Sequence, residues 1–545
     1  MTGKKSKKVK SKKVRNATKS AKVKNEAKRT LERARNFRYA LILEGVAVGI
    51  LSGAGIVLFR LAISRAEVHM ELLRAFASQK VLMTVTYFFV IFALALFCAF
   101  LLRKEGLISG SGIPQVKGEM IDRIESKWYR VLALKFIGAV SAIGAGLSLG
   151  REGPSVQLGA MIGKGFSRAT KKLRTEEKLL MTCGAGAGLS AAFNAPLAGV
   201  VFALEELHKN FSEEVLMSTM SAAITADFVS RYVFGLDPVF SVATPEMLPL
   251  RYYGLVLLLG ILLGAGGVLY NLSIRKAQDF YGHIRDLTPR IVIPFLLAGV
   301  LGLLYPSVLG GGSPLVEEIA GGGIALKGLL LLLAVKYIYS MLSFGSGAPG
   351  GIFLPLLVLG SILGGSFFDI TQPLFGLDSV YLANFVIFGM AGYFAAIVRA
   401  PITGVILISE MTGSLSHLLT LSLVSLTASV TADLLSGKPI YNQLLDRILA
   451  KQVIEEGRAN VKRDRKKVLV ETPVYFGSEA DGLRVSELLL PKGTLIVSLT
   501  REEEEIVPHG ATIIRGGDRL VVLCNSDETA AVDARLDEAC RKMKI

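Results

Sequence analysis

The chain has 545 residues, of which 51% are hydrophobic and 20% charged, and its formal net charge is +17. Uncharged stretches such as Val81–Leu102 are long enough to cross a bilayer core of about 30 Å, which excludes an ordinary soluble protein. The four cysteines and five histidines are scattered without ligand spacing, so neither disulfides nor a metal or other cofactor is expected.

The first 38 residues form a basic segment. They hold sixteen Lys and Arg residues against Glu26 and Glu32, a net charge of +14 that leaves +3 for the remainder. The segment has no apolar period, which predicts a disordered or loosely helical tail rather than a secretory signal. By the positive-inside tendency we expect this end to be cytoplasmic and to lie on anionic lipid, with no nucleic-acid partner.

A series of apolar stretches predicts membrane helices after this tail. Several stretches are too short to span upright, or are broken by Gly and Pro, which is typical of helices that stop partway at transporter sites. Most of the 57 glycines are expected at close contacts between helices. In chain order the stretches are 39–60, 81–102, 128–149, 176–204, 214–236, 251–273, 288–305, 323–345, 351–368, 379–398 and 400–435.

Three glycine-proline motifs lie inside this apolar sequence: Gly110–Pro114 (GSGIP), Gly150–Pro154 (GREGP) and Gly351–Pro355 (GIFLP). Each places flexible backbone beside the expected start of a helix. Such backbone is tolerated at membrane depth only where it is buried in protein or lines a polar cavity. Because helix N-termini carry unpaired N–H groups and partial positive charge, three converging ones would bind an anion. The motifs therefore predict an anion transporter.

The membrane portion, 39–445, is predicted to be duplicated, with halves of about 39–240 and 250–445. The segment Ala195–Val200 leads to Glu205, and Ala400–Val405 leads to Glu410 at a constant offset of 205. Whether the halves are inverted or parallel stays open. A second set of matches, offset by 201, pairs Pro154, Leu158, Gly159 and Gly163 with Pro355, Leu359, Gly360 and Gly364.

The composition changes after Tyr441. Residues 446–466 are highly charged and predict a linker or connecting helix, and 467–545 predict a small cytosolic α/β domain. About 80 residues fold only marginally alone, which favours pairing of two copies. The expected elements are strands at 468–470, 494–498 and 519–523, a short helix beginning within 481–490, and a final amphipathic helix over 528–543.

The ordered set of three motifs resembles the CLC family of chloride channels and proton-coupled chloride exchangers. Lys135 precedes the second motif and Gly437–Tyr441 (GKPIY) closes the similarity, which covers about 39–445. The C-terminal stretch resembles the TrkA-C (RCK C-terminal) regulatory domain through Ser486–Leu488, Ile506–Gly510 and Gly516–Asp518. The expected fold is an all-α polytopic membrane protein of two repeated halves with broken helices, plus the α/β domain.

Glu152 is the first candidate for function. An ionised carboxylate at a helix start can itself fill an anion site, and once protonated it can move away and admit chloride. The residues alone also allow a helix cap paired with Arg151. The resemblance implies that Glu152 is the external gate.

The remaining anion contacts combine hydroxyl and backbone donors. Ser111 can donate its hydroxyl, and the flanking glycines let backbone approach closely, although an isolated serine is often only a cap. The resemblance implies that Ser111 and Tyr441 hold chloride toward the cytoplasm, and that serine rather than proline favours chloride over nitrate. The predicted chloride-binding residues are Ser111, Gly112, Ile113, Arg151, Gly153, Ile352, Phe353 and Tyr441.

Two further features bear on the anion path. Ile352 and Phe353 would offer backbone N–H groups, and the Phe353 ring would narrow the path; alternatively Gly350 and Gly351 only loosen a helix. Lys135 is an intramembrane cation, a class of residue that is functional by default. It is interpreted as a diffuse attraction for chloride, with a buried structural ion pair as the alternative.

Glu205 and Glu206 end an apolar run and could simply mark the cytoplasmic edge of the membrane. The resemblance implies that Glu206 is the internal proton-transfer glutamate of exchangers, which many channels lack. Glu205 and its repeat mate Glu410 are expected to be structural.

The predicted protein is a multi-pass homodimer of the cell membrane with cytoplasmic N- and C-terminal regions. It would exchange chloride for protons and is not an enzyme, and an unknown small ligand could act on its C-terminal domain. A passive chloride channel on the same scaffold is the alternative. A cation-transport regulator is a distant one, since no carbonyl-filter sequence is present.

Overall fold

The computed structural model describes the backbone of residues 3–209, 212–240, 246–459, 467–491, 493–501, 504–525 and 529–541, with side chains described from Tyr39 onward apart from short gaps. The chain divides into two compact units, Met1–Leu449 and Ala450–Ile545, which we call the membrane unit and the C-terminal unit.

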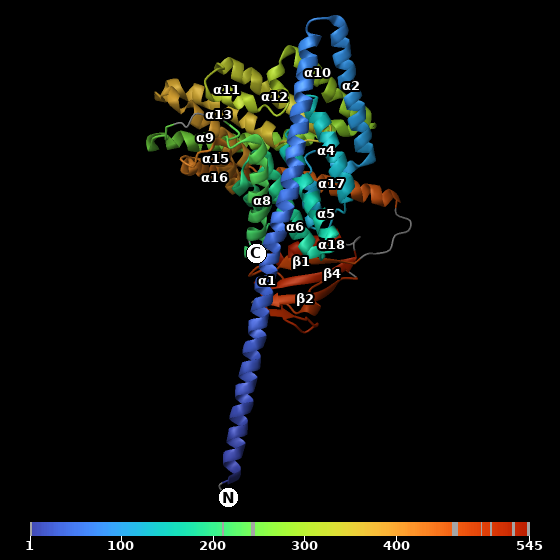
Figure 1. Cartoon of the computed structure of the whole chain (residues 1–545), viewed down its shortest axis with the longest axis vertical. Coiled ribbons are helices and arrows are strands. Elements are labelled where there is room, and N and C mark those ends of the chain that lie inside the picture. The colour runs from blue at the N-terminus through green and yellow to red at the C-terminus, as the bar shows by residue number, and fades with distance from the viewer. Residues whose placement is uncertain are drawn as a thin grey trace. The chain divides into compact units, whose positions relative to one another are not determined.

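Helices make up the membrane unit (Figure 1). The α-helices are α1 (Gly3–Ala77), α2 (Val81–Lys104), α3 (Ile113–Met120), α4 (Trp128–Gly144), α5 (Glu152–Ala169), α6 (Arg174–Phe193), α7 (Pro196–Phe202), α8 (Glu213–Phe234), α9 (Tyr253–His283), α10 (Leu287–Leu304), α11 (Ser313–Ala320), α12 (Leu326–Gly345), α13 (Phe353–Phe375), α14 (Leu382–Val398), α15 (Pro401–Thr412), α16 (Leu418–Leu434) and α17 (Ile440–Ala459), which runs past the unit boundary. A π-helical turn, η2 (Ala203–His208), continues α7, and short 3₁₀ turns are η1 (Gly106–Ile108), η3 (Leu250–Tyr252), η4 (Pro306–Val308) and η5 (Ser379–Tyr381).

Seven segments among the described residues are long and apolar enough to cross a membrane. The predicted apolar stretches coincide with helices, but 176–204 and 400–435 each contain a break. In the first, Asn194 adopts a left-handed conformation (φ 53°) before Pro196, which ends α6 and starts α7. In the second, Gly413 adopts a left-handed conformation (φ 67°) and ends α15. The helix start expected at the first motif is that of the eight-residue α3. The eight-residue α11 was not predicted, because it is too short to show a period.

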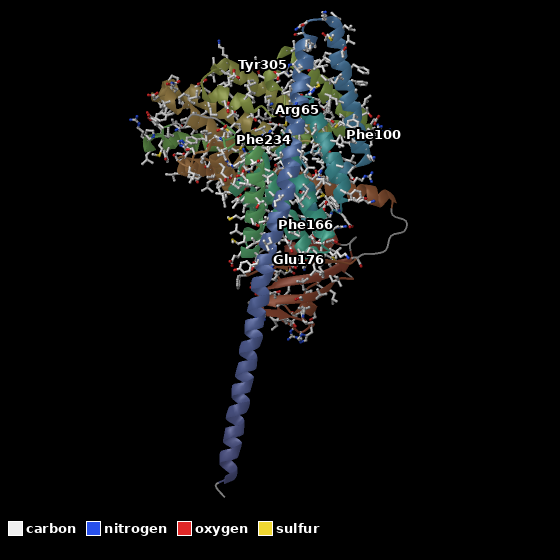
Figure 2. The ribbon with its side chains drawn as sticks, viewed as in Figure 1. Arg65, Phe100, Phe166, Glu176, Phe234 and Tyr305 are labelled. Carbon is white, nitrogen blue, oxygen red and sulfur yellow. The ribbon has the colours of Figure 1, made fainter. Side chains whose placement is uncertain are left out.

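The outer surface of this unit is apolar. Phe100 of α2, for example, projects away from the neighbouring helices with 58% of its surface exposed (Figure 2). Inside, glycines allow backbones to touch: a Cβ added to Gly159 of α5 would lie 2.0 Å from the carbonyl oxygen of Gly184 in α6. One added to Gly360 of α13 would lie 2.5 Å from that of Gly389 in α14. These glycines lie at close helix contacts, which is the role expected for most glycines of the chain.

Residues that the predicted duplication makes equivalent contact each other or make matching contacts. Gly150 and Gly351, equivalent at offset 201, form an antiparallel bridge in which each amide donates to the other's carbonyl oxygen at 2.7 Å. Because this pairing is reciprocal, the two equivalent loops meet in an antiparallel arrangement. Lys135 and Lys336, also 201 apart, bind equivalent loops: Lys135 donates to the carbonyls of Ile108 and Gly110, and Lys336 to those of Val308 and Gly310.

A four-stranded antiparallel sheet forms the C-terminal unit, in the order β1-β4-β2-β3. The elements are β1 (Lys467–Pro473), η6 (Val485–Glu487), β2 (Leu495–Arg501), β3 (Glu504–Ile506), β4 (Arg519–Asn525), α18 (Thr529–Leu536) and the π-helical η7 (Asp537–Arg541). The buried face includes Leu499, Leu520 and Val522 of the sheet, together with Val532 and Leu536 of α18.

Two details of this unit differ from the predicted elements. The helix expected to begin within 481–490 is only the 3₁₀ turn η6. Gly482 is left-handed (φ 90°), which interrupts a helix. The amides of Gly482 and Val485 donate to the carbonyls of Ile514 and Thr512 instead of to a preceding helical turn. The short strand β3 was not predicted. The three predicted strands and the final helix are present, the helix from Thr529.

Candidate functional site

The three glycine-proline motifs meet in space, and each precedes a helix as predicted: α3, α5 and α13 begin at Ile113, Glu152 and Phe353. The amide of Gly350 donates to the carbonyl of Gly110 at 3.0 Å, which joins the third motif to the first. The Gly150–Gly351 bridge joins the third to the second. A Cβ added to Gly153 would lie 2.8 Å from the Cβ of Ser111, so the first and second motifs are also in direct contact.

The start of α3 depends on a glycine. Gly112 is left-handed (φ 92°), and a Cβ there would lie 2.3 Å from Oε1 of Gln157. Pro114 follows in the first turn, where a missing N–H costs nothing. The buried Ser111 hydroxyl accepts from the amide of Ile113 at 3.3 Å, which leaves the hydroxyl hydrogen available to another acceptor.

Glu152 is completely buried, and neither carboxylate oxygen has a hydrogen-bond partner among the described residues. The carboxylate nevertheless interacts with the backbone amides of Arg151, Glu152 and Leu354, which belong to the N-termini of α5 and α13. A Cβ added to Gly150 would lie 2.1 Å from Oε2 of Glu152. The side chain therefore occupies a site lined by these backbone N–H groups, which we call the amide seat. Only glycine at position 150 leaves room for the carboxylate there.

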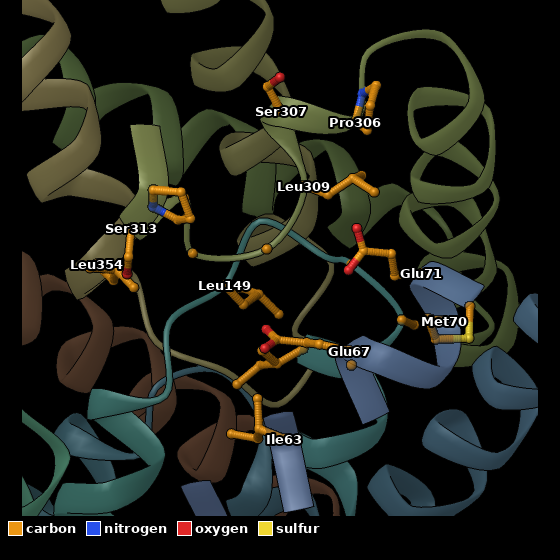
Figure 3. A pocket seen from close by; sticks show the side chains of 18 of the residues that line it. Ile63, Glu67, Met70, Glu71, Leu149, Pro306, Ser307, Leu309, Ser313 and Leu354 are labelled. Carbon is orange, nitrogen blue, oxygen red and sulfur yellow. The ribbon is translucent and has the colours of Figure 1, made fainter. Parts of the chain in front are cut away.

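Arg151 lies beside this seat and lines a cavity of about 580 Å³. Glu67 and Glu71 line the cavity from α1, and Leu309 and Ser313 also line it (Figure 3). Leu149, Gly150 and Leu354 also line it, so the cavity reaches the backbone that surrounds Glu152.

Aromatic rings surround the start of α13. The ring of Phe353 lies 4.6 Å from that of Phe394, 5.4 Å from Phe193 and 6.2 Å from Phe202. Phe202 in turn contacts Tyr441 at 6.5 Å. Tyr441 is fully buried, and its hydroxyl has no hydrogen-bond partner in the described part of the chain. A buried hydroxyl without a partner at this position is suited to donate to an anion.

Lys135 is fully buried and donates to the carbonyls of Ile108, at 2.9 Å, and Gly110, at 2.6 Å. No carboxylate among the described residues is within ion-pair distance of it, so the alternative of a buried ion pair has no support here. Its ammonium group holds the backbone just before Ser111, and its attraction for chloride stays a prediction. Lys336 was missed, although an intramembrane charge in the apolar span α12 was a signal for it.

Glu205 and Glu410 have structural partners. Glu205 accepts from the amides of Ile402 and Thr403, and Glu410 accepts from those of Leu197 and Ala198. Each carboxylate thus caps the helix that leads to the other.

Glu206 is buried, and its Oε1 lies 2.6 Å from the ammonium of Lys117 in α3. The same ammonium donates to Oδ1 of Asn442 at 2.5 Å. Sequence reasoning missed Lys117 and Asn442, although a lysine four residues after Ile113 in an apolar region carries the same signal as Lys135. Within the described residues no group of three or more His, Cys, Asp and Glu side chains could hold a metal ion.

Comparison with known protein families gives two matches. Residues 94–433 match the family described as "Voltage gated chloride channel", and residues 469–537 match the TrkA-C domain.

Curated relatives and solved structures agree with these matches. The chain is 40% identical over 356 residues to an H(+)/Cl(-) exchange transporter ClcA of Vibrio cholerae, which covers 64% of this chain and 76% of the relative. A ClcA of Yersinia pestis is 40% identical over 361 residues, covering 65% and 75%. The crystal structure of a slow cyanobacterial Cl-/H+ antiporter has a TM-score of 0.73 at 31% identity, covering 76% of this chain and 98% of that one. A eukaryotic CLC transporter, with a TM-score of 0.65 at 22% identity and covering 75% of this chain and 74% of that one, shares the fold.

Proposed function

Because the chain belongs to the CLC family of chloride channels and proton-coupled chloride exchangers, we propose that it exchanges chloride for protons across the membrane. The observation that carries this proposal is the pair of buried carboxylates, Glu152 in a seat of backbone amides and Glu206 in an ion pair with Lys117. The relatives named as H(+)/Cl(-) exchange transporters support exchange over passive conduction.

The amide seat explains how one residue can serve both ions. Backbone N–H groups at two helix N-termini favour a negative charge, whether it is the carboxylate of Glu152 or a chloride ion. The two anions therefore compete for one place. Protonation of Glu152 removes its charge, weakens its hold on the seat and lets chloride replace it. Each chloride that enters from this side thus requires a proton on Glu152, and this requirement couples the two fluxes.

The inner contacts come from Ser111 and Tyr441, whose hydroxyls donate to chloride, and from amides of Gly112, Ile113, Gly153, Ile352 and Phe353. Glu206 passes protons between the cytoplasm and the path by a separate route. Ser111 and Tyr441 present neutral donors to the anion, and Lys135, which binds the carbonyl of Gly110, adds a diffuse attraction for it.

The test is a proton flux driven uphill by a chloride gradient in liposomes that contain the purified chain. We expect uphill proton movement that stops when chloride is absent. Glu206→Gln should abolish proton movement while chloride flow continues, and Glu152→Gln should abolish it and make chloride flow insensitive to pH. Chloride flow in the wild type with no accompanying proton movement would instead identify a passive channel.

Assembly, orientation and regulation complete the proposal. Two copies form a dimer with one anion path in each, which the mass of the detergent-solubilised protein tests. The N- and C-terminal regions face the cytoplasm; a Ser6→Cys variant should react with an impermeant thiol reagent only from that side, since the four native cysteines are buried. The TrkA-C-like unit binds a small ligand that biases transport, and removing residues 467–545 should abolish this regulation but leave exchange intact.

A further inference from the structure

Lys117 connects α3, η2 and α17, three elements that carry different ion contacts in the proposed exchange. It lies in α3, with 6% of its surface exposed. Its ammonium contacts Glu206 of η2 at 2.6 Å and Asn442 of α17 at 2.5 Å. One cation is therefore the common partner of all three segments.

Each of the three elements leads directly to a proposed ion contact. The helix α3 begins at Ile113, directly after Ser111 and Gly112. Asn442 directly follows Tyr441. The two hydroxyls proposed to hold chloride on the inner side are therefore carried by the two segments that Lys117 ties to the proton-transfer glutamate.

The ion pair depends on the charge of Glu206. With Glu206 ionised, the buried ammonium is compensated and holds α3, η2 and α17 together. With Glu206 protonated, the ammonium keeps neutral hydrogen bonds to that carboxyl and to Asn442 but loses the ionised partner that it contacts, which is unfavourable for a buried charge. The three-way contact is thus weaker after protonation, and the segments that carry Ser111 and Tyr441 are freer to separate.

We propose that Lys117 is a positioning residue that links the proton on Glu206 to the inner chloride contacts at Ser111 and Tyr441. The proposal rests on the proposed exchange function. Because such a link is reciprocal, chloride at the inner contacts also changes how readily Glu206 takes a proton.

Other charges face this cluster and belong to the argument. Lys209 and Glu205 act on Glu206 from its own segment, and Lys209 and Asp446 act on Lys117. His208 lies at the end of the same segment, and its Nδ1 is 3.1 Å from the hydroxyl of Thr182 in α6. Of these cations only Lys117 is in hydrogen-bond contact with both Glu206 and Asn442.

The same helix provides a matched control. Glu119 of α3 forms a second buried ion pair, with Lys164 of α5 at 2.5 Å. Lys164→Gln removes a buried ammonium from an ion pair on α3, as Lys117→Gln does, but touches neither Glu206 nor Asn442. An effect of losing any buried pair on α3 would appear in both variants.

The experiment measures chloride and proton fluxes of the full chain in liposomes over a range of internal pH. We expect Lys117→Gln to lower the number of protons moved per chloride by about fivefold or more and to flatten the internal-pH dependence of chloride flux. Lys117→Arg, which keeps the charge, should restore most of both. Lys164→Gln should keep the wild-type ratio and pH profile. In a Glu206→Gln background, Lys117→Gln should add almost nothing.

Asn442→Ala gives a second approach if Lys117→Gln does not fold. It leaves the Lys117–Glu206 ion pair in place and removes the hydrogen bond that connects Lys117 to the segment carrying Tyr441. We therefore expect a lower proton-to-chloride ratio with chloride flux retained. The role of Lys117 is refuted if Lys117→Gln, or in its absence Asn442→Ala, has the wild-type ratio and pH profile, or if the effects of Lys117→Gln and Glu206→Gln multiply independently. If the wild-type chain carries chloride without moving protons, the proposed exchange is wrong. The role of Lys117 can still be tested in that case, because the internal-pH dependence of chloride flux reports on it separately.

Discussion

Glu205 and Glu410 cap each other's helices: the carboxylate of Glu205 accepts from the first amides of α15, and that of Glu410 accepts from the first amides of α7. Both amide pairs follow an Ala-Pro step, Ala195-Pro196 or Ala400-Pro401. The two halves are therefore locked by a pair of equivalent bonds between helix ends.

Removing the charge from either carboxylate should destabilise the membrane unit. We expect Glu205→Gln and Glu410→Gln each to cost about 1–2 kcal/mol, because each loses a charged cap at a helix N-terminus. Thermal unfolding in detergent measures the effect. Asp279→Asn, which breaks an exposed pair with Arg447, is the control and should change stability little. Equal unfolding temperatures for all variants would contradict the capping role.

Gly150→Ala should displace the side chain of Glu152 while leaving its carboxylate group unchanged. The added Cβ would lie 2.1 Å from Oε2 of Glu152, so the side chain has to leave its seat of amides. We expect chloride flux to lose much of its pH dependence and the proton-to-chloride ratio to fall. Gly106→Ala is the matched control, since no atom lies within 4 Å of a Cβ there. Normal coupling in Gly150→Ala would show that Glu152 does not use this seat.

Tyr441→Phe should weaken chloride binding and leave stability nearly unchanged. The hydroxyl that it removes has no protein partner among the described residues, so no internal hydrogen bond is lost. A hydrogen bond to a charged group contributes about 1.5–3 kcal/mol, so the dissociation constant measured by calorimetry should rise about tenfold or more. Tyr337→Phe, which loses a hydrogen bond to Ser273, should show the reverse: lower stability and unchanged binding.

Asp122, in the loop after α3, predicts a pH dependence of stability. Burial opposes its ionisation, but hydrogen bonds from Lys178 and Arg174 outweigh burial and lower the pKa of Asp122. A lowered pKa contributes stability above the ordinary value for aspartate, and this stability is lost as the pH falls through the lowered one. Asp122→Asn should therefore lower the unfolding temperature at neutral pH and have less effect at about pH 3. A constant difference between the two proteins at both pH values would exclude this ion-pair cluster as its cause.

The short motifs contained much of the site. Glycine and proline have few uses at membrane depth, so Gly110–Pro114, Gly150–Pro154 and Gly351–Pro355 predicted three helix starts and an anion site where these starts converge. The contacts of Lys117 were beyond reach, because its partners Glu206 and Asn442 are 89 and 325 residues away in the chain. The constant offset of 205 residues likewise showed that Glu205 and Glu410 are equivalent. It did not show that each carboxylate caps a helix in the other half of the chain.

By itself the sequence determined the class of protein, the apolar spans, the duplication and the residues with unusual chemistry, because these depend on local composition and spacing. The strands and final helix of the C-terminal unit followed for the same reason. Only the tertiary structure decided that Gly150 pairs with Gly351, that Glu152 is seated on amides from two helices, and that Lys117 joins Glu206 to Asn442. Such contacts depend on how segments distant in the chain pack together, and no local pattern encodes that packing.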